Sequence, residues 1–355
     1  MPAPAPEAQP VSAATGIVTV LMTLIGWSSV PLFITHFARS IDIWTSNGWR
    51  YGFSALLWAP VLIWQWRRRT LPRGLWRAAL VPALFNSAGQ VAFAWSFYHI
   101  DPATATFGLR MQIVFVAIGA YLMFPAERAV LRRPLTWLGI AMVLAGIGGT
   151  IFASPGKHEQ THAFGVVLAL SGGLMFAGYG LAVRHWMHSF HPVTAFASIS
   201  QYTALAMVGL MLALGERGGM RALDTSVLSR GQFELLLLSA IIGIALGHVF
   251  YYISIARLGV AVSSGVIQLQ PFCVAVGSHF LFPETPITQM QIVFGSIAVA
   301  GAILMLAVQN SISRAARRER AGVADLESLT VPGEQEPAIE GGDLDAVPAE
   351  TPPCR

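Results

Sequence analysis

Long apolar stretches, separated by short polar or proline-containing joints, dominate the hydrophobicity pattern of this chain. Each stretch is 19 to 25 residues long, and a membrane-spanning α-helix needs about 20 mostly apolar residues. Lipid offers no water to an open backbone, so stretches of this length predict helices. The pattern predicts ten spanning helices, over residues 15–38, 43–66, 75–99, 102–124, 135–153, 164–186, 192–214, 232–256, 260–282 and 287–309.

Composition supports the same fold class, an all-α membrane protein. Hydrophobic residues make up 54% of the chain and charged residues 11%, against roughly 25% charged residues in ordinary globular proteins. This balance excludes a soluble enzyme and a wholly disordered chain, and it makes the lipid bilayer the first predicted partner. The net charge of +4 does not predict nucleic-acid binding, because the basic residues stand between apolar runs and form no stripe.

The two ends of the chain differ from the apolar body. Residues 1–14 carry no basic segment ahead of the first span, so we expect that span to remain uncleaved. Residues 1–14 and 310–355 are predicted to be disordered, the latter being rich in Glu, Asp, Pro and Gly toward its end.

Arginine placement predicts the orientation in the membrane. The joints at 67–73 and 125–133, and the segment after 310, hold most of the loop arginines, and ten spans place all three on one side. Because cytoplasmic loops carry an excess of Arg and Lys, both termini are predicted to be cytoplasmic, in the inner (plasma) membrane.

An internal repeat gives the most specific signal in the sequence. Residues 89–125 align without a gap over residues 247–283, at a constant offset of 158 residues. Gly89 then lies over Gly247, Gln112 lies over Gln270, and both copies end in Phe-Pro. The repeat predicts two units of five spans, residues 15–153 and 164–309. Five is odd, so the second unit is expected upside down in the membrane, which is the architecture of many secondary transporters.

Several short motifs resemble the EamA family of the drug/metabolite transporter superfamily. They are Gly26-Trp27, Arg50, the FPAER sequence at 124–128, FPET at 282–285 and Gln270-Pro271. The resemblance covers about residues 15–308 and implies transport of small metabolites, often export of amino acids or related compounds. The first copy has Ile113 where the second has Pro271, so a kink in the fourth span is left open.

Arg110 is the most informative polar residue, because it lies near the middle of the fourth span. A charged side chain at the bilayer centre costs about 2.5–3.5 kcal/mol or more, so it needs a partner or a function. One interpretation pairs it with a polar group of the bundle. The other places it in a substrate cavity, where its planar fork binds an anionic group.

Polar residues recur at equivalent positions of the two copies. Thr106 and Arg110 are spaced i, i+4 and are expected on one helix face. Their counterparts in the second copy are Ser264 and Gln268. The recurrence predicts a shared substrate-binding cavity at the interface of the repeats.

The third and eighth spans extend this set. Asn86 and Gln90 share a face of the third span, and the counterpart of Gln90 is His248, itself i, i+4 with Tyr252. No Asp or Glu lies deep in any span, which leaves His248 as the candidate titrating group near the midplane.

Other residues fit two interpretations each. Trp27 and Tyr179 stand in corresponding spans and are candidates to line the cavity or to pack against neighbouring helices. Arg50 lies seven residues into its span, close enough to snorkel to the headgroups or to remain inside. The histidines at 185, 188 and 191 have no Cys or carboxylate nearby, so no metal site is predicted.

The sequence therefore predicts a secondary transporter of small metabolites working by alternating access, with no cofactor. The alternatives are a membrane-embedded enzyme and a receptor or sensor. Hydrolase motifs and a phosphate-binding loop are missing, which weighs against the first.

Overall fold

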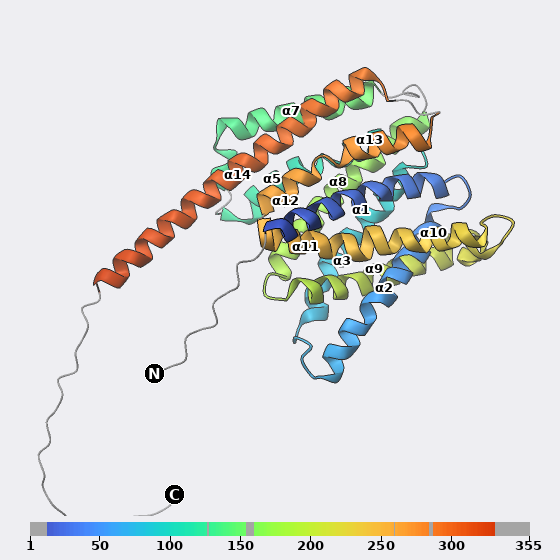
Figure 1. The fold of residues 1–355 in the computed structure, drawn as a ribbon, viewed down its shortest axis with the longest axis horizontal. Coiled ribbons are helices and arrows are strands. Elements are labelled where there is room, and N and C mark those ends of the chain that lie inside the picture. The colour runs from blue at the N-terminus through green and yellow to red at the C-terminus, as the bar shows by residue number, and fades with distance from the viewer. Residues whose placement is uncertain (1–12, 126–127, 154–159, 259, 284–286, 331–355) are drawn as a thin grey trace, which may run out of the picture. The chain divides into compact units, whose positions relative to one another are not determined.

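The structure, a computed structural model, describes residues 13–125, 128–153, 160–258, 260–283 and 287–330 (Figure 1). The chain divides into two units, Met1–Ile312 and Ser313–Arg355. The helical bundle and the site belong to the first unit. Helices make up most of the described ranges, which contain no strand.

The helices follow the predicted spans in order. Those of the first half are α1 (Ala13–Phe37), α2 (Ile43–Arg67), α3 (Leu75–Ser96), α4 (Pro102–Leu109), α5 (Gln112–Met123), α6 (Arg128–Leu131) and α7 (Pro134–Phe152). Those of the second half are α8 (Gln160–Trp186), α9 (Pro192–Leu214), η2 (Glu216–Leu223), α10 (Arg230–Ala240), the π-helical η3 (Ile241–Leu246), α11 (Gly247–Leu258), α12 (Val260–Ile267), α13 (Gln270–Leu281) and α14 (Gln289–Thr330).

Prolines begin several of these helices, as their position in the sequence predicts. Pro102, Pro134 and Pro192 stand in the first turns of α4, α7 and α9, where the missing N–H costs nothing. The Asp101 carboxylate caps α4 by accepting a hydrogen bond from the backbone N–H of Thr104 at 2.9 Å.

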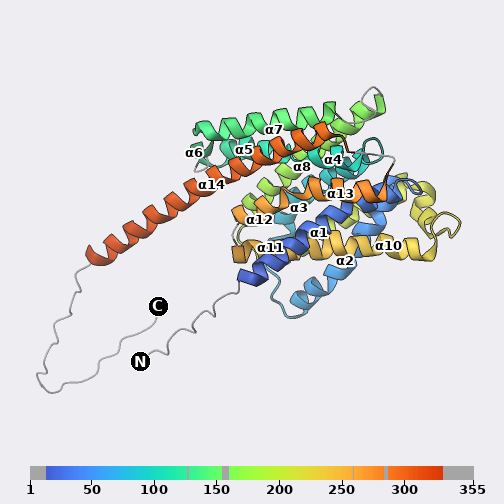
Figure 2. The same ribbon diagram turned by 45° about the horizontal axis from the view of Figure 1, so that its top comes forward.

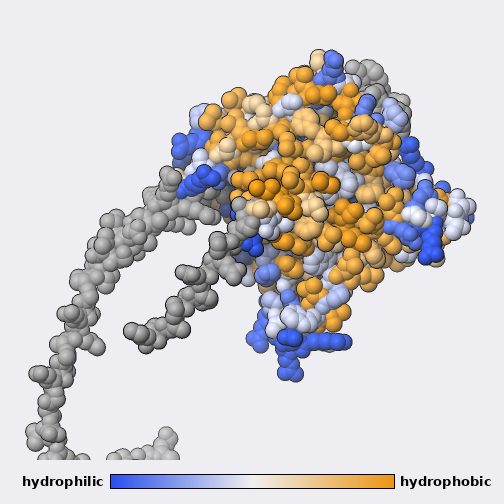
Figure 3. Space-filling model, in the orientation of Figure 1, coloured by the Kyte–Doolittle hydropathy of each residue, from blue (hydrophilic) through white to orange (hydrophobic). Residues whose placement is uncertain are grey.

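The surface of the bundle is that of a multi-pass membrane protein. Among the described residues, eight helices are long and apolar enough to cross a bilayer. The predicted spans 43–66 and 260–282, both of which carry several polar residues, are not among the eight, so the count of ten stays a prediction. Large apolar side chains face outward, for example Phe280 at 78% and Leu84 at 70% exposure. Figure 3 shows apolar side chains over the flanks of the helices and hydrophilic ones gathered at their ends.

Helices of one half pack against helices of the other. α3 packs along α8, α1 along α11 and α2 along α9, and α1 lies beside the α10–α11 segment in both ribbon views (Figures 1 and 2). In the repeat, the third span (α3) corresponds to the eighth span (which contains α11), and the first span (α1) corresponds to the sixth span (α8). The α3–α8 and α1–α11 pairs are therefore equivalent. The α2–α9 pair joins the second and seventh spans, which correspond to each other. This reciprocal pattern is what a twofold relation between the halves produces.

The last helix is longer than the sequence predicts. The final span was expected to end at 309, but α14 continues to Thr330. The added segment is rich in Ala, Arg, Glu and Leu, which are strong helix formers. The predicted disorder of residues 1–12 and 331–355 lies outside the described residues.

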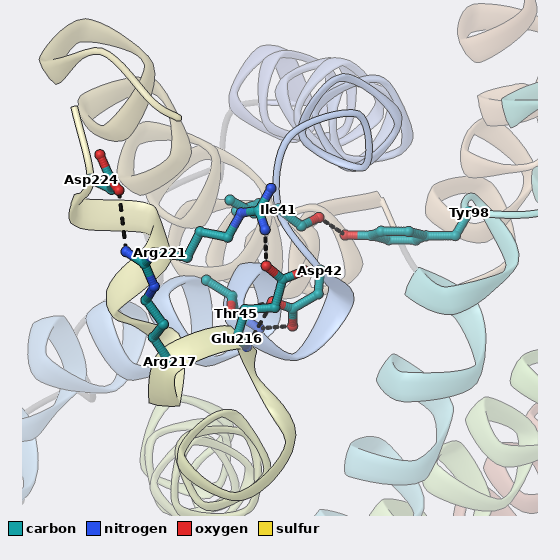
Figure 4. Close-up of polar contacts among 8 residues, drawn as sticks. All are labelled: Ile41, Asp42, Thr45, Tyr98, Glu216, Arg217, Arg221 and Asp224. Carbon is teal, nitrogen blue, oxygen red and sulfur yellow. Dashed lines mark hydrogen bonds and ion pairs between the residues drawn. The ribbon is translucent and has the colours of Figure 1, made fainter. Parts of the chain in front are cut away.

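One end of the bundle, made of residues 38–42, 97–101 and 215–229, is closed by contacts between its loops; it is called the closed end below. Asp42 is the centre of these contacts (Figure 4). Its carboxylate caps α2 by accepting from Thr45 N at 2.8 Å, and it also accepts from the backbone N–H of Glu216 at 3.1 Å. The Tyr98 hydroxyl donates to the carbonyl of Ile41 at 3.0 Å. Three separate connections are thereby joined.

The loop between α9 and α10 is itself ordered by polar contacts. The Trp49 indole N–H donates to the carbonyl of Gly219 at 2.9 Å, and Arg217 pairs with Asp224 at 3.4 Å. Hydrogen bonds from Ser226, followed by the nearby positive charge of Arg217, lower the pKa of the Asp224 carboxyl below its ordinary value. This loop therefore keeps a defined shape over the closed end.

Candidate functional site

Two of the spans are broken at equivalent positions near their middles. α4 ends at Leu109 and α5 begins at Gln112; α12 ends at Ile267 and α13 begins at Gln270. At the first break the backbone N–H of Arg110 bonds three residues back, at 2.9 Å, to the carbonyl of Phe107. Such tighter turns mark local departures from the α-helix.

The break in the fourth span forms without a proline. The sequence left open whether the fourth span is kinked, because Ile113 stands where the second copy has Pro271. Hydrogen bonds to the carbonyl three residues back also appear at the second break, where the Leu269 N–H donates to the carbonyl of Val266 at 3.0 Å. The repeat counterparts Arg110 and Gln268 thus each occupy the break of their own half.

A cavity of about 610 Å³ begins at these breaks. Its lining reaches the last turn of α8 and the start of α6, at the end of the bundle opposite the closed end. Its volume is within the range of about 300–1,000 Å³ typical of small-molecule sites. Seven of the ten predicted site residues line it, namely Trp27, Arg110, Tyr179, His248, Tyr252, Ser264 and Gln268.

Arg110 both lines the cavity and pairs with a polar group of the bundle, and binding of an anionic group stays a prediction. One Nη of its guanidinium donates to the side-chain oxygen of Gln270. Its Nε has no partner among the described residues. Gln270 is neutral, so this contact leaves the positive charge of Arg110 uncompensated.

Aromatic rings form one wall of the cavity. The Trp27 ring lies 5.3 Å from the His248 ring and 5.0 Å from the Tyr251 ring, centre to centre. Phe196 stacks on His248 at 4.4 Å from behind. The Tyr251 hydroxyl lies 2.8 Å from the Ser264 hydroxyl. The Tyr251 hydroxyl is therefore held in place by a neighbour.

Repeat-related glycines make room for two of these rings. A Cβ on Gly247 would lie 2.5 Å from the Trp27 indole nitrogen, and a Cβ on Gly89 would lie 3.0 Å from the Phe176 ring. Both rings line the cavity. From the sequence, Trp27 and Tyr179 stand in corresponding spans. The equivalent glycine contacts instead make Phe176 the structural counterpart of Trp27 in the other half.

His248 presents a defined nitrogen to its surroundings. Its Nδ1 lies 2.9 Å from the carbonyl of Ile244. A carbonyl only accepts, so Nδ1 carries the proton of the neutral ring and Nε2 is left as an acceptor. Ile244 belongs to η3, the π-helical turn, and such turns occur frequently at functional sites.

Three of the predicted residues do not line the cavity. Thr106 is buried and donates to the carbonyl of Pro102 at 2.6 Å, and Asn86 donates to the Thr203 hydroxyl at 2.9 Å. The face shared by Thr106 and Arg110 assumed an unbroken helix, whereas α4 ends at Leu109. Gln90 is also outside the lining although its counterpart His248 is inside it, so the two halves contribute different residues to the cavity.

Arg50 lies inside the bundle. It is 2% exposed, and its Nε donates to the Ser239 hydroxyl at 2.9 Å. Of the two interpretations left open by the sequence, snorkelling to the headgroups does not occur in this structure.

Several lining residues were not predicted from the sequence. Gln112, Tyr251 and Gln309 contribute polar groups. Arg184 lines the cavity from the last turn of α8, with its guanidinium 4.3 Å from the centre of the Phe124 ring. The repeat offered a signal for Gln112, since it is the counterpart of Gln270. Among the described residues, no cluster of His, Cys, Asp and Glu is arranged to hold a metal ion.

A helical bundle with a cavity between two related halves is the architecture of many secondary transporters. The comparisons with known proteins give the family. The chain matches the EamA-like transporter family over residues 14–152 and 163–307, and it belongs to that family.

Individual relatives are more distant. The chain is 29% identical over 195 residues to an uncharacterized transporter from Synechocystis sp., a match covering 54% of this chain and 55% of that protein. The chain thus matches little more than half the length of that relative. It is 23% identical over 297 residues to a putative sugar uptake protein from Lactiplantibacillus plantarum, covering 80% of this chain and 95% of the relative.

A solved crystal structure supports the fold. It covers 85% of this chain and 99% of its own length, with a TM-score of 0.52 at 14% identity. At that identity the similarity shows the fold alone.

Proposed function

We propose that this EamA-family transporter exports amino acids or related anionic and zwitterionic metabolites by alternating access, from the inner (plasma) membrane, with both termini in the cytoplasm. The observation that carries the proposal is the charge of Arg110 in the cavity wall.

No carboxylate side chain offsets this charge from within the cavity. Among the described lining residues there is no Asp or Glu, and the hydrogen-bond partner of Arg110 is the amide of Gln270. An uncompensated guanidinium in a low-dielectric site is unfavourable, so a carboxylate on the substrate would relieve that cost on binding. Carboxylates also fit the planar fork of arginine.

The aromatic wall suits the cationic end of a zwitterion. His248 offers Nε2 as an acceptor, and the faces of Trp27 and Tyr251 stand beside it. Aromatic faces attract ammonium groups by about 0.5–2 kcal/mol. An amino acid would thus place its carboxylate at Arg110 and its ammonium group toward His248 and Trp27.

The state of the bundle fits one step of alternating access. The cavity reaches one end of the helices, while Asp42 and Tyr98 tie the loops of the other end together. In the predicted orientation the reached end is cytoplasmic. The cavity would then load from the cytoplasm, as an exporter requires.

A second candidate function is sugar transport. It is favoured by the name of the Lactiplantibacillus relative and by the combination of Trp27 with the amides of Gln112 and Gln268 in the wall. A neutral sugar would not require the charge of Arg110. A membrane-embedded enzyme and a receptor or sensor are the remaining alternatives.

Transport by the purified protein in proteoliposomes separates these functions. We expect efflux of a labelled amino-acid mixture that falls strongly in Arg110→Gln, while labelled neutral sugars are not carried. Sugar transport that is insensitive to Arg110→Gln would favour the second candidate. A folded protein that moves no member of an amino-acid, sugar and organic-acid panel would contradict the transporter proposal.

A further inference from the structure

A proline opens a gap in the hydrogen bonding of α1 beside the cavity. Pro31 lies inside this helix. Proline has no backbone N–H, so the carbonyl four residues earlier, that of Trp27, receives no helical bond from it. Buried carbonyls are nearly always paired, and an orphan here would be costly.

The side chain of Gln270 fills this gap from another helix. Its Nε2 donates to the Trp27 carbonyl at 2.7 Å. Gln270 is the first residue of α13, directly after the break in the ninth span, and it is 5% exposed. The carbonyl can only accept, so it fixes which end of the amide carries the NH₂ group.

This orientation turns the amide oxygen toward Arg110. With Nε2 committed to Trp27, the Oε1 of Gln270 accepts from one Nη of Arg110. One edge of the guanidinium is thereby held, while its Nε keeps no partner among the described residues. The charge is retained because the holding group is an amide and not a carboxylate.

We propose that Gln270 is a positioning residue for the substrate anion: it orients Arg110 in the cavity wall, and the Pro31 gap in α1 sets its own orientation. The inference rests on the proposed function, since it concerns the same site. It assigns to Gln270 a role in anion affinity that its repeat counterpart does not share, because Gln112 lines the cavity itself.

The contacts that run from the Pro31 gap through Gln270 to Arg110 are called the relay below. A substitution at Gln270 and a substitution at Pro31 test the relay separately. Gln270→Leu keeps the side-chain bulk and removes both hydrogen bonds. Pro31→Ala gives the Trp27 carbonyl a helical N–H, which competes with the amide of Gln270. Pro60→Ala is the matched control, because Pro60 also lies inside a helix, α2, and that helix contributes no residue to the cavity wall.

The experiment is competition for efflux of a labelled amino-acid mixture from proteoliposomes. Unlabelled L-leucine and L-phenylalanine are each compared with the corresponding amino alcohol, which lacks the carboxylate. A hydrogen bond to a charged group typically contributes enough for about a tenfold change in affinity. We therefore expect Gln270→Leu to raise the half-inhibitory concentration of the acids about tenfold and that of the amino alcohols by less than about twofold.

The remaining variants locate the effect. Pro31→Ala should shift the acids in the same direction by a smaller factor, Pro60→Ala should not, and Gln270→Leu should add nothing in an Arg110→Gln background. Equal shifts for acids and amino alcohols would mean a merely structural role and would overturn the proposal. If Gln270→Leu fails to reconstitute, Pro31→Ala with no acid-specific shift overturns it by itself. The relay would be refuted if Arg110→Gln lost the preference for the acids while Gln270→Leu and Pro31→Ala both kept it. That outcome would leave the proposed function standing.

Discussion

Arg110 and Gln268 occupy equivalent positions in the two halves of the chain, and each stands at the break of its own span in the wall of one cavity. The repeat places a cation in one half where the other half has a neutral amide. A symmetric scaffold therefore carries an asymmetric charge, and that asymmetry gives the cavity a direction for binding a substrate with two different ends.

Arg110→Gln should separate binding from folding. It introduces the residue that the second half already carries at the equivalent position, so the bundle should remain intact. Loss of the charge-assisted contact should raise KM for anionic substrates on the order of a hundredfold. Efflux from proteoliposomes at several substrate concentrations measures this change.

Arg50→Gln is the matched control for that experiment. Arg50 is also an arginine inside a span, but it bonds Ser239 and does not line the cavity. We expect its KM to stay within about twofold of the original, since it makes no contact with the substrate. An equal rise in KM in both variants would indicate that any buried arginine of the bundle, and not the cavity site in particular, controls transport.

Much of the architecture could be predicted from the sequence. The apolar runs and prolines such as Pro102 and Pro134 placed the helices, and the offset that aligns Gly89 with Gly247 identified the two halves. The family is confirmed by the match over both halves. These features are periodic or repeated, so single-sequence patterns express them strongly.

The site could be predicted only in part, because helix faces change at breaks. The spacing of Thr106 and Arg110 would put them on one face of a continuous helix, but α4 ends between them. Tyr251 and Arg184 were missed because nothing distinguishes them from other aromatic and basic residues near span ends. The burial of Arg50 depends on Ser239, which is 189 positions away in the sequence.

Gly247→Ala tests the aromatic wall. The added methyl group would lie 2.5 Å from the Trp27 indole nitrogen and must displace that ring. We expect efflux to fall by about tenfold, because a small misplacement of a binding group has large kinetic effects. Gly209→Ala has open space around the added atom and gains helix propensity of about 1 kcal/mol. It should retain full efflux, and equal losses in the two variants would contradict a specific role for the Trp27 position.

A reporter fused after Asn310 tests the orientation. The arginine distribution predicts that this end of the bundle faces the cytoplasm. A fusion to a fluorescent protein should be bright, and a fusion to a phosphatase that folds only in the periplasm should be inactive. The reverse result would place the cavity mouth outside and would convert the proposed export into uptake.

Asp42→Ala tests whether the loop contacts hold the far side of the cavity shut. The change removes the cap of α2 and also the bond to Glu216 N–H, whereas Ser229→Ala removes only the cap of α10. Caps contribute about 1 kcal/mol, so both variants should lose similar thermal stability.

Only the first variant should also open the closed end. A cysteine at Ala222, which is fully buried there, reports opening through its reaction with a membrane-impermeant maleimide, after both native cysteines are changed to serine. A loss of about 1 kcal/mol from the closed state raises the open population about fivefold. Labelling should accelerate by that factor in Asp42→Ala and remain unchanged in Ser229→Ala. Equal labelling rates would show that Asp42 stabilises α2 without gating access, and the closed state would then depend on the apolar packing of Phe37, Leu228 and Leu236 around Ala222.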